Sequence, residues 1–143
     1  NKTPDDWRRL GDTMNALGRR VAKGGLTLAY HNHDMEFRPF PSALPNAALP
    51  YDLLVRATDP SLVTMQLDLW WVAKAGTSAA AVLRRHRGRF ALLHVKEPGN
   101  TKEAGMSCDG QTFVELGPTL AAAARGGVRH IICENEDPAD HYA

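Results

Sequence analysis

The sequence lacks several features that mark specialised classes of protein. Only 2 of its 143 residues are cysteines, and its 17 lysines and arginines nearly balance 16 acidic residues, for a net charge of +1. No apolar run approaches the roughly 20 residues that a transmembrane helix needs. A disulfide scaffold, a membrane span and the basic surface of a nucleic-acid-binding protein are therefore not expected. Cys133, in an apolar segment, is expected to be a small buried residue.

The composition is that of one globular domain. It is 43% hydrophobic and 23% charged, enough apolar material for a core, so residues 1–143 are expected to form a single domain. The chain begins Asn-Lys-Thr-Pro, with neither an initiator methionine nor the apolar core of a signal peptide, so no leader indicates its location. We expect a cytoplasmic location and leave a periplasmic one open.

Segments with helical spacing alternate with short apolar segments along the chain. Helices are expected at 4–23, 51–57, 78–86 and 113–125, and strands at 26–31, 62–69, 89–96 and 128–134. The strands are rich in aliphatic residues, as in parallel sheets that are covered on both faces. This order predicts an α/β fold of the parallel (β/α) TIM-barrel type with about four βα units.

Four βα units are half of a barrel. An eight-stranded barrel typically needs about 250 residues, and four strands leave two sheet edges and an apolar interior uncovered. The chain is therefore expected to be the C-terminal half of a longer polypeptide, or to pair with a second copy of itself.

Each predicted strand leads into side chains that can bind a divalent metal. They lie in HNHDME at 31–36, QLDLWW at 66–71, LLHVKE at 92–97 and IICENE at 131–136. Because parallel strands deliver their C-terminal ends to one face, we expect Asp68, His94 and Glu134 to converge there. One imidazole and two carboxylates suit Mn²⁺, Mg²⁺ or a similar ion.

The individual residues have alternative interpretations. Asp68 lies in an apolar strand, where a carboxylate is costly to bury without a partner, and a purely structural role would need an arginine or a backbone cap that the sequence does not show. His94 could be a buried histidine bonded to the backbone, but Lys96 shares its face and favours a site. Glu134 shares its face with Glu136, and a solvated strand end is the alternative for both. His86, His130 and His141 are expected at the surface or at strand starts.

The segments LAYHNHDMEF, QLDLWWVAKAG, LLHVKE and CENEDP resemble the sugar phosphate isomerase/epimerase family, the xylose-isomerase-like TIM barrels. The resemblance runs from about Leu26 to Pro138. It implies a metal-dependent barrel that acts on sugars or polyols and holds its metal at the ends of its last four strands. The Asp, His and Glu ligands of the family correspond to Asp68, His94 and Glu134.

The chain departs from the family at its first strand. Many relatives have a glutamate ligand at that strand's end, where this sequence has Tyr30 followed by HNH. Strand alternation places His31 and His33 on one face and Asn32 on the other. We therefore expect one of these two histidines, assigned as His31, to be the fourth metal ligand, with His33 as a substrate contact and Glu36, further into the loop, beside the substrate.

The resemblance and the ligand set together predict an isomerase or epimerase of a sugar or sugar derivative. The ion, Mn²⁺, Mg²⁺ or Co²⁺, would act as a Lewis acid that stabilises an enediolate intermediate. Glu36 or Glu134 would move the proton, and Lys96 would stabilise negative charge or protonate a leaving group. Three further residues would contact the sugar, two of them as an aromatic wall: Trp70, Trp71 and Glu136.

Three other functions fit part of the pattern. A dehydratase or lyase acting on a keto-sugar or inosose would share the same intermediate. An endonuclease of the related DNA-repair branch would need more metal ligands and a basic groove, which the net charge does not supply. A non-catalytic barrel fragment would need no metal.

Overall fold

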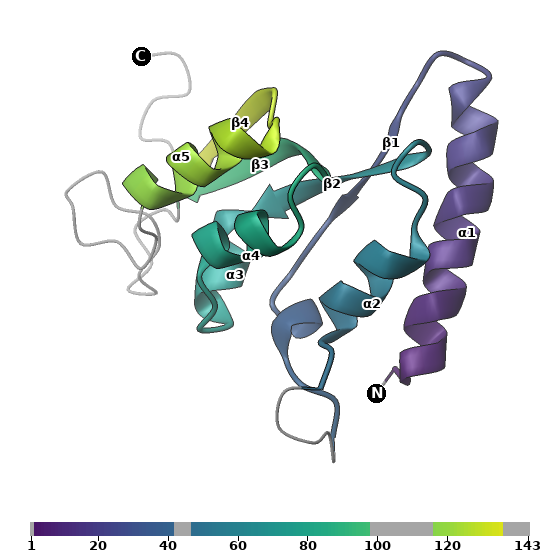
Figure 1. Ribbon diagram of the computed structural model, residues 1–143, viewed down its shortest axis with the longest axis horizontal. Coiled ribbons are helices and arrows are strands. Elements are labelled where there is room, and N and C mark those ends of the chain that lie inside the picture. Colours follow the sequence, from purple (N-terminus) through teal and green to yellow (C-terminus); the bar gives the residue numbers. More distant parts are fainter. Residues whose placement is uncertain (1, 42–46, 98–115, 136–143) are drawn as a thin grey trace.

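Four parallel strands form one sheet, in the same order as along the chain (Figure 1). They are β1 (Leu28–His31), β2 (Val63–Asp68), β3 (Phe90–Glu97) and β4 (His130–Asn135). This computed structural model describes residues 2–41, 47–97 and 116–135. All neighbouring strands pair in parallel, so their C-terminal ends lie at one edge. The predicted fold, four βα units of TIM-barrel type, is confirmed.

Helices connect the strands and pack beside them in two groups. Their bounds are α1 (Pro4–Ala22), the 3₁₀ helix η1 (Met35–Phe37), α2 (Pro50–Ala57), α3 (Leu69–Lys74), α4 (Ala79–Arg85) and α5 (Leu116–Gly126). Helix α1 packs against α2 and contacts β1 and β2, whereas α4 packs against α5, which contacts β3 (Figure 1). No helix in the described part of the chain is both long and apolar enough to cross a bilayer.

The two faces of the sheet differ in how well they are covered. Val63, Met65 and Leu67 alternate along β2 and are fully buried in the helix-covered core. Thr64 and Gln66 point to the opposite face and are only partly buried. Both faces of the sheet were expected to be covered. Among the described residues, only the face that packs against the helices is.

Strand β4 is the most exposed strand. Ile131 and Ile132 point to opposite faces and are 53% and 42% exposed. Cys133, expected to be buried, is exposed and unpaired, because the described residues place no further layer over this edge strand. Both observations agree with a half-barrel whose edge other elements would cover.

The end of β2 differs from the prediction. The strand was expected to continue through Leu69, with Trp70 and Trp71 at its end, but it stops at Asp68 and α3 begins at once. The Asp68 side chain accepts a hydrogen bond from the Trp71 amide at 2.9 Å and so caps the helix. Both tryptophans therefore lie on a helix.

His86 was expected at the surface but lies between two helices. Its side chain is 10% exposed, and its Nε2 lies 2.8 Å from Oδ1 of the buried Asp52. Arg85 contacts the other oxygen of the same carboxylate at 3.0 Å. Burial lowers the pKa of His86 below its ordinary value, against the opposing effect of Asp52. His130 is exposed at the start of β4, as predicted, and His141 lies outside the described residues.

Two glycines on one face of α1 allow α1 to approach the chain around β2 closely. A Cβ at Gly18 would lie 2.7 Å from the Leu62 carbonyl oxygen, and one at Gly11 would overlap Ala57. Neither contact is with the far end of a flexible side chain, so the backbone itself would have to move. The close approach therefore depends on the missing side chains.

We expect Gly18→Ala to lower the free energy of unfolding by about 1–3 kcal/mol, because the methyl group must displace backbone. Urea denaturation followed by circular dichroism measures the change. Gly117→Ala is the matched control, since α5 leaves open space at that position. It should be neutral or slightly stabilising, because alanine favours helix over glycine. Equal losses in the two variants would contradict close packing at Gly18.

Candidate metal centre

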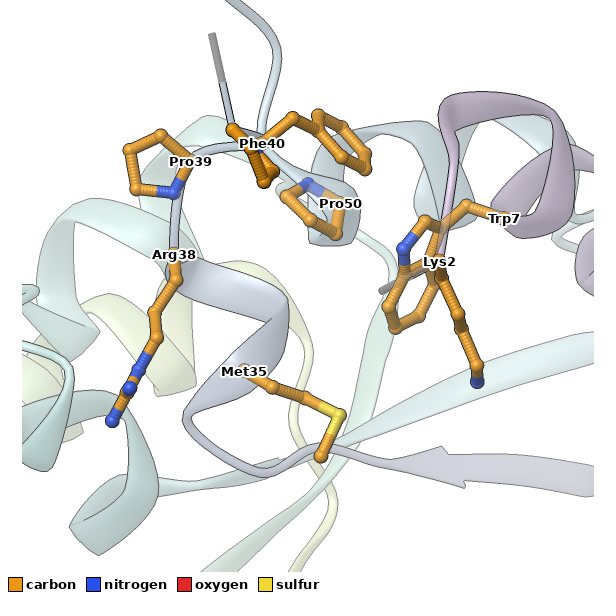
Figure 2. Close-up of a pocket in the computed structure, with 8 residues that line it drawn as sticks. Lys2, Trp7, Met35, Arg38, Pro39, Phe40 and Pro50 are labelled. Carbon is orange, nitrogen blue, oxygen red and sulfur yellow. The ribbon is translucent and has the colours of Figure 1, made fainter. Parts of the chain in front are cut away.

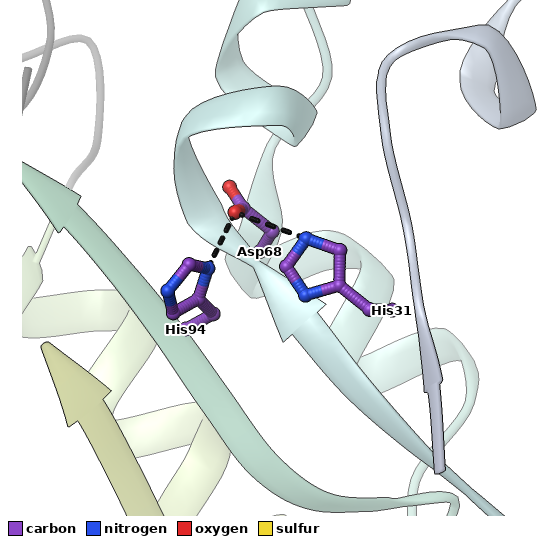
Figure 3. A group of neighbouring side chains, drawn as sticks. All are labelled: His31, Asp68 and His94. Carbon is purple, nitrogen blue, oxygen red and sulfur yellow. Dashed lines mark hydrogen bonds and ion pairs between the residues drawn. The ribbon is translucent and has the colours of Figure 1, made fainter. Parts of the chain in front are cut away.

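Three side chains from three neighbouring strands meet at the C-terminal edge of the sheet. His31 ends β1, Asp68 ends β2, and His94 lies in β3 directly beside Asp68 in the strand register. Each offers one ligand atom, and these atoms lie within 4.8 Å of one another (Figure 3). We call these three residues, the candidate ligands of one ion, the metal cluster.

Asp68 is at the centre of the metal cluster and has no exposed surface. Its Oδ1 accepts the Trp71 amide, whereas Oδ2 lies 2.7 Å from His94 Nδ1 and 3.4 Å from His31 Nε2. One oxygen is thus fixed by the start of α3, and the other faces both imidazoles. A buried carboxylate is costly unless such partners, or a cation, compensate its charge.

In each imidazole, the ring nitrogen that faces away from Asp68 contacts a side-chain oxygen. His31 Nδ1 lies 2.8 Å from Gln66 Oε1, which can only accept a hydrogen bond. In a neutral His31 the ring proton is therefore on Nδ1, and the lone pair of Nε2 faces Asp68. A cation between the imidazole and the carboxylate would stabilise that arrangement. His94 Nε2 lies 3.1 Å from Glu134 Oε2. Outer oxygens of this kind typically orient metal-bound histidines.

This donor set fits a divalent ion. Two borderline imidazole nitrogens and one hard carboxylate oxygen suit first-row transition ions such as Mn²⁺ or Co²⁺ better than Mg²⁺, an ion that prefers oxygen alone. His31, Asp68 and His94 are therefore the residues that would hold such an ion.

Glu134, predicted as a metal ligand, contacts the metal cluster only through His94. Its side chain is 43% exposed and contacts His94 on the nitrogen that faces away from Asp68. The metal cluster does not include it. The geometry is that of a carboxylate that orients a metal-binding imidazole, and its role as a ligand or proton carrier stays a prediction.

Glu36, predicted to lie beside the substrate and to be a candidate proton carrier, is buried and does not belong to the metal cluster. It is 2% exposed, and its carboxylate accepts hydrogen bonds from the Tyr30 hydroxyl at 2.6 Å and the His33 amide at 3.1 Å. Burial, and then the bond to Glu36, raise the pKa of Tyr30 far above its usual range, so the phenol stays a donor. Both carboxylate oxygens are thus engaged in holding the loop after β1.

Aromatic side chains lie beside the metal cluster. The His33 ring centre lies 5.5 Å from that of His31 and 5.1 Å from that of Trp71, and Trp71 contacts Trp70 edge to face at 4.4 Å. The Lys74 ammonium lies over both tryptophans, at 4.5 and 4.9 Å from their ring centres. The predicted substrate contacts at His33 and Trp71 therefore adjoin the cluster.

The side chains of two predicted site residues, Lys96 and Glu136, lie outside the described part of the structure. Lys96 belongs to β3, two residues beyond His94 and level with Glu134. Glu136 follows the last described residue. Their proposed roles stay predictions.

Asn32 and Gln66 are two polar residues at the site that sequence reasoning missed as site residues. Asn32, expected on the face opposite the two histidines, is completely buried and bonds to the Asp68 backbone. Gln66 precedes Asp68 by two residues in β2, which places it on the same face as Asp68. That spacing within an apolar strand was the available signal for Gln66.

The described residues also form an open cavity of about 500 Å³ (Figure 2). Its walls include Trp7, Met35, Phe40 and Pro50, with Arg38 at one side. The cavity shares no lining residue with the metal cluster. It is therefore a feature of the loop after β1 and the start of α1, separate from the candidate centre.

Known enzymes are similar in sequence to this chain. The inosose dehydratase of Halalkalibacterium halodurans is 27% identical over 113 residues, which are 79% of this chain and 35% of the relative. That of Clostridium beijerinckii is 27% identical over 93 residues, 65% of this chain and 29% of the relative. No protein-family model matches the sequence.

Among solved structures, a sugar phosphate isomerase/epimerase from Parabacteroides distasonis superposes with a TM-score of 0.78 at 24% identity. The match covers 97% of this chain and 50% of that one. A second structure of this description, from the same organism, gives a TM-score of 0.78 at 22% identity. Both contain the four βα units described above and extend well beyond them.

The fold is thus that of half a (β/α) barrel, and it superposes on proteins described as sugar phosphate isomerases/epimerases. The resemblance to the sugar phosphate isomerase/epimerase proteins is confirmed in fold by the solved structures, and inosose dehydratases are similar in sequence. The chain spans about half the length of those solved structures and about a third of the length of the curated relatives.

The Tyr30–Glu36 bond should contribute to stability. We expect Tyr30→Phe to lower the free energy of unfolding by about 1–3 kcal/mol, because it leaves a buried carboxylate with one donor fewer. Tyr51→Phe is the control, since the buried Tyr51 hydroxyl has no hydrogen-bond partner within the described residues. It should be neutral or stabilising in the same urea titrations. A larger loss for Tyr51→Phe would contradict this account.

Asp68→Asn should remove metal binding while keeping the fold, because asparagine caps a helix as well as aspartate does. We expect affinity for Mn²⁺ or Co²⁺ to fall by at least about 100-fold, since even outer partners of metal ligands contribute about 10–100-fold. Calorimetric titration measures the affinity. Asp52→Asn, which alters a buried helix-capping carboxylate outside the cluster, should destabilise the protein yet leave metal affinity unchanged.

Proposed function

We propose that this chain forms the metal-binding half of an enzyme that isomerises or epimerises a sugar or sugar derivative by removing a proton next to a carbonyl. The observation that carries the proposal is the convergence of His31, Asp68 and His94 at the C-terminal edge of three parallel strands. In (β/α) barrels this edge carries the active site. Proteins of the same fold that are described as sugar phosphate isomerases/epimerases support the reaction class.

The metal cluster would hold one divalent ion through His31, Asp68 and His94. When bound, the ion would supply a Lewis acid that polarises the substrate carbonyl and stabilises the charge of an enediolate. The chain's own contribution is to keep the three side chains in place: α3 fixes Asp68, Gln66 fixes His31 and Glu134 fixes His94. A preorganised site needs little rearrangement during the reaction.

Glu134 is the proposed proton-transfer group. Its carboxylate contacts the metal cluster through His94, yet 43% of the side chain is exposed, so protons can exchange with a substrate or with solvent. Glu36 is less suited, because Tyr30 and the His33 amide already bond to its buried carboxylate. Lys96, two residues beyond His94, is proposed to stabilise negative charge.

The aromatic group beside the metal cluster is proposed as one wall of the substrate pocket. The His33 ring lies next to the rings of both His31 and Trp71. An aromatic surface next to polar groups suits a sugar, which has apolar C–H faces and polar hydroxyl edges. Trp70 and Glu136 are proposed as further contacts.

A second candidate is a dehydratase acting on an inosose-like keto-polyol. The curated relatives, which are inosose dehydratases, favour it. Removal of the same proton would be followed by loss of a neighbouring hydroxyl group, protonated by Lys96 or Glu134. The two candidates share the metal cluster and differ in what leaves the substrate.

The complete catalytic unit is proposed to contain more than these four βα units. The uncovered face of the sheet carries the metal cluster, and Ile132 on that face is 42% exposed. Either further βα units of the same polypeptide or a second copy would cover this face and supply the rest of the substrate pocket. The metal cluster itself needs only the strands described here.

The test is metal-dependent proton exchange in deuterium oxide. Purified protein loaded with Mn²⁺ or Co²⁺ is incubated with keto-sugars and with an inosose, and products are followed by NMR. Deuterium uptake that retains every hydroxyl group indicates an isomerase or epimerase, whereas loss of water indicates the dehydratase. EDTA and Asp68→Asn should abolish either reaction.

Light scattering in the same buffers gives the oligomeric state that accompanies activity. A folded protein that takes up no metal at micromolar concentrations would contradict the proposal and leave a non-catalytic fragment. Full turnover by a monomer of these 143 residues would contradict the need for covering elements.

A further inference from the structure

Asn32 joins the ends of the two strands that carry His31 and Asp68. The main-chain ladder between β1 and β2 ends at the pair His31 and Gln66. Beyond it, Asn32 Oδ1 accepts a hydrogen bond from the Asp68 amide at 2.9 Å, and its Nδ2 donates to the Asp68 carbonyl at 3.4 Å. A side-chain amide thus continues the ladder where the two backbones separate.

The chemistry of this contact is specific to asparagine. Asp68 presents one backbone donor and one backbone acceptor, and a carboxamide offers the matching acceptor and donor, which orients it without ambiguity. Aspartate could accept but could not donate. Because Asn32 has no exposed surface, an unmatched group there would lose its hydrogen bond to water as well.

We propose that Asn32 is a positioning residue for the metal centre, which sets the separation of His31 from Asp68; this rests on the proposed function. Asn32 follows His31 directly in the chain and binds both backbone groups of Asp68, so it couples one ligand to the other. The Asp68 carboxylate is also anchored by the Trp71 amide, which leaves Oδ2 facing His31 Nε2 at 3.4 Å. Loss of Asn32 would free the Asp68 backbone while the α3 cap remained.

Asn15 provides a matched control, because it makes the same kind of contact elsewhere. Its Nδ2 donates to the Ala57 carbonyl at 2.9 Å, and its Oδ1 accepts from the Asp59 amide at 2.7 Å. It also joins elements distant in sequence, α1 and the turn after α2. A merely structural amide bridge and a positioning one can therefore be compared within one protein.

The experiment compares Asn32→Ala with Asn15→Ala in the purified chain. Co²⁺ affinity is measured from the visible absorption of the bound ion, and thermal unfolding is measured in EDTA. Both variants are expected to lower the unfolding temperature. Only Asn32→Ala should weaken Co²⁺ binding, by about 10–100-fold, and alter the absorption spectrum. Equal weakening in both variants, or unchanged Co²⁺ binding by folded Asn32→Ala, overturns the proposal.

A second readout does not need metal. In the metal-free protein, nitrogen–proton spectra of the imidazoles report the contacts of His31 and His94 with Asp68. Asn32→Ala should shift both sets of resonances and Asn15→Ala neither; unshifted resonances overturn the proposal. If the wild-type chain binds no Co²⁺, the proposed function fails, and these spectra still decide the role of Asn32.

If Asn32→Ala does not fold, Asn32→Asp replaces it, because the ionised side chain keeps the acceptor for the Asp68 amide and has a negative charge in place of the donor. Its Co²⁺ spectrum and imidazole resonances are expected to differ from those of the wild type. Identity of both with the wild type overturns the proposal.

Discussion

The buried carboxylate of Asp68 is the interaction on which the rest of the site depends. It ends β2, caps α3 with one oxygen and faces two imidazoles with the other. An unpaired charge without exposure would cost several kcal/mol, so the surrounding groups must compensate it. The same residue therefore ends a strand, starts a helix and organises the metal cluster.

The two faces of the sheet around Asp68 have different roles: one packs in the core and the other carries the candidate site. The helix-covered face buries Val63, Met65 and Leu67, while the opposite face presents Gln66 and Asp68 from the same strand. Because successive side chains of a strand point to opposite faces, neighbouring residues of β2 belong to the apolar core and to the polar site in turn. The buried layer holds the strands in place, and the ligands take their positions from those strands.

The order of strands and the residues at their ends could be predicted because parallel strands bring their C-terminal ends together whatever the loops do. Three features could not. Alternation continues through Asp68 in the sequence, so the start of α3 and the position of Trp71 required the capping bond. Nothing local indicated that Glu36 turns toward Tyr30. The apolar neighbours of Cys133 indicated a buried residue, but Cys133 is exposed because β4 is at the edge of the sheet.

The sequence by itself determined the α/β order, the four βα units and the strand ends at which His31, Asp68 and His94 meet, because periodicity and costly buried polar groups are local properties. The tertiary structure alone decided which neighbours hold those ligands. Asn32 is 36 residues from Asp68 and Gln66 is 35 from His31, and only strand pairing brings them within hydrogen-bond distance. Contacts between strands depend on register, which no single segment of sequence contains.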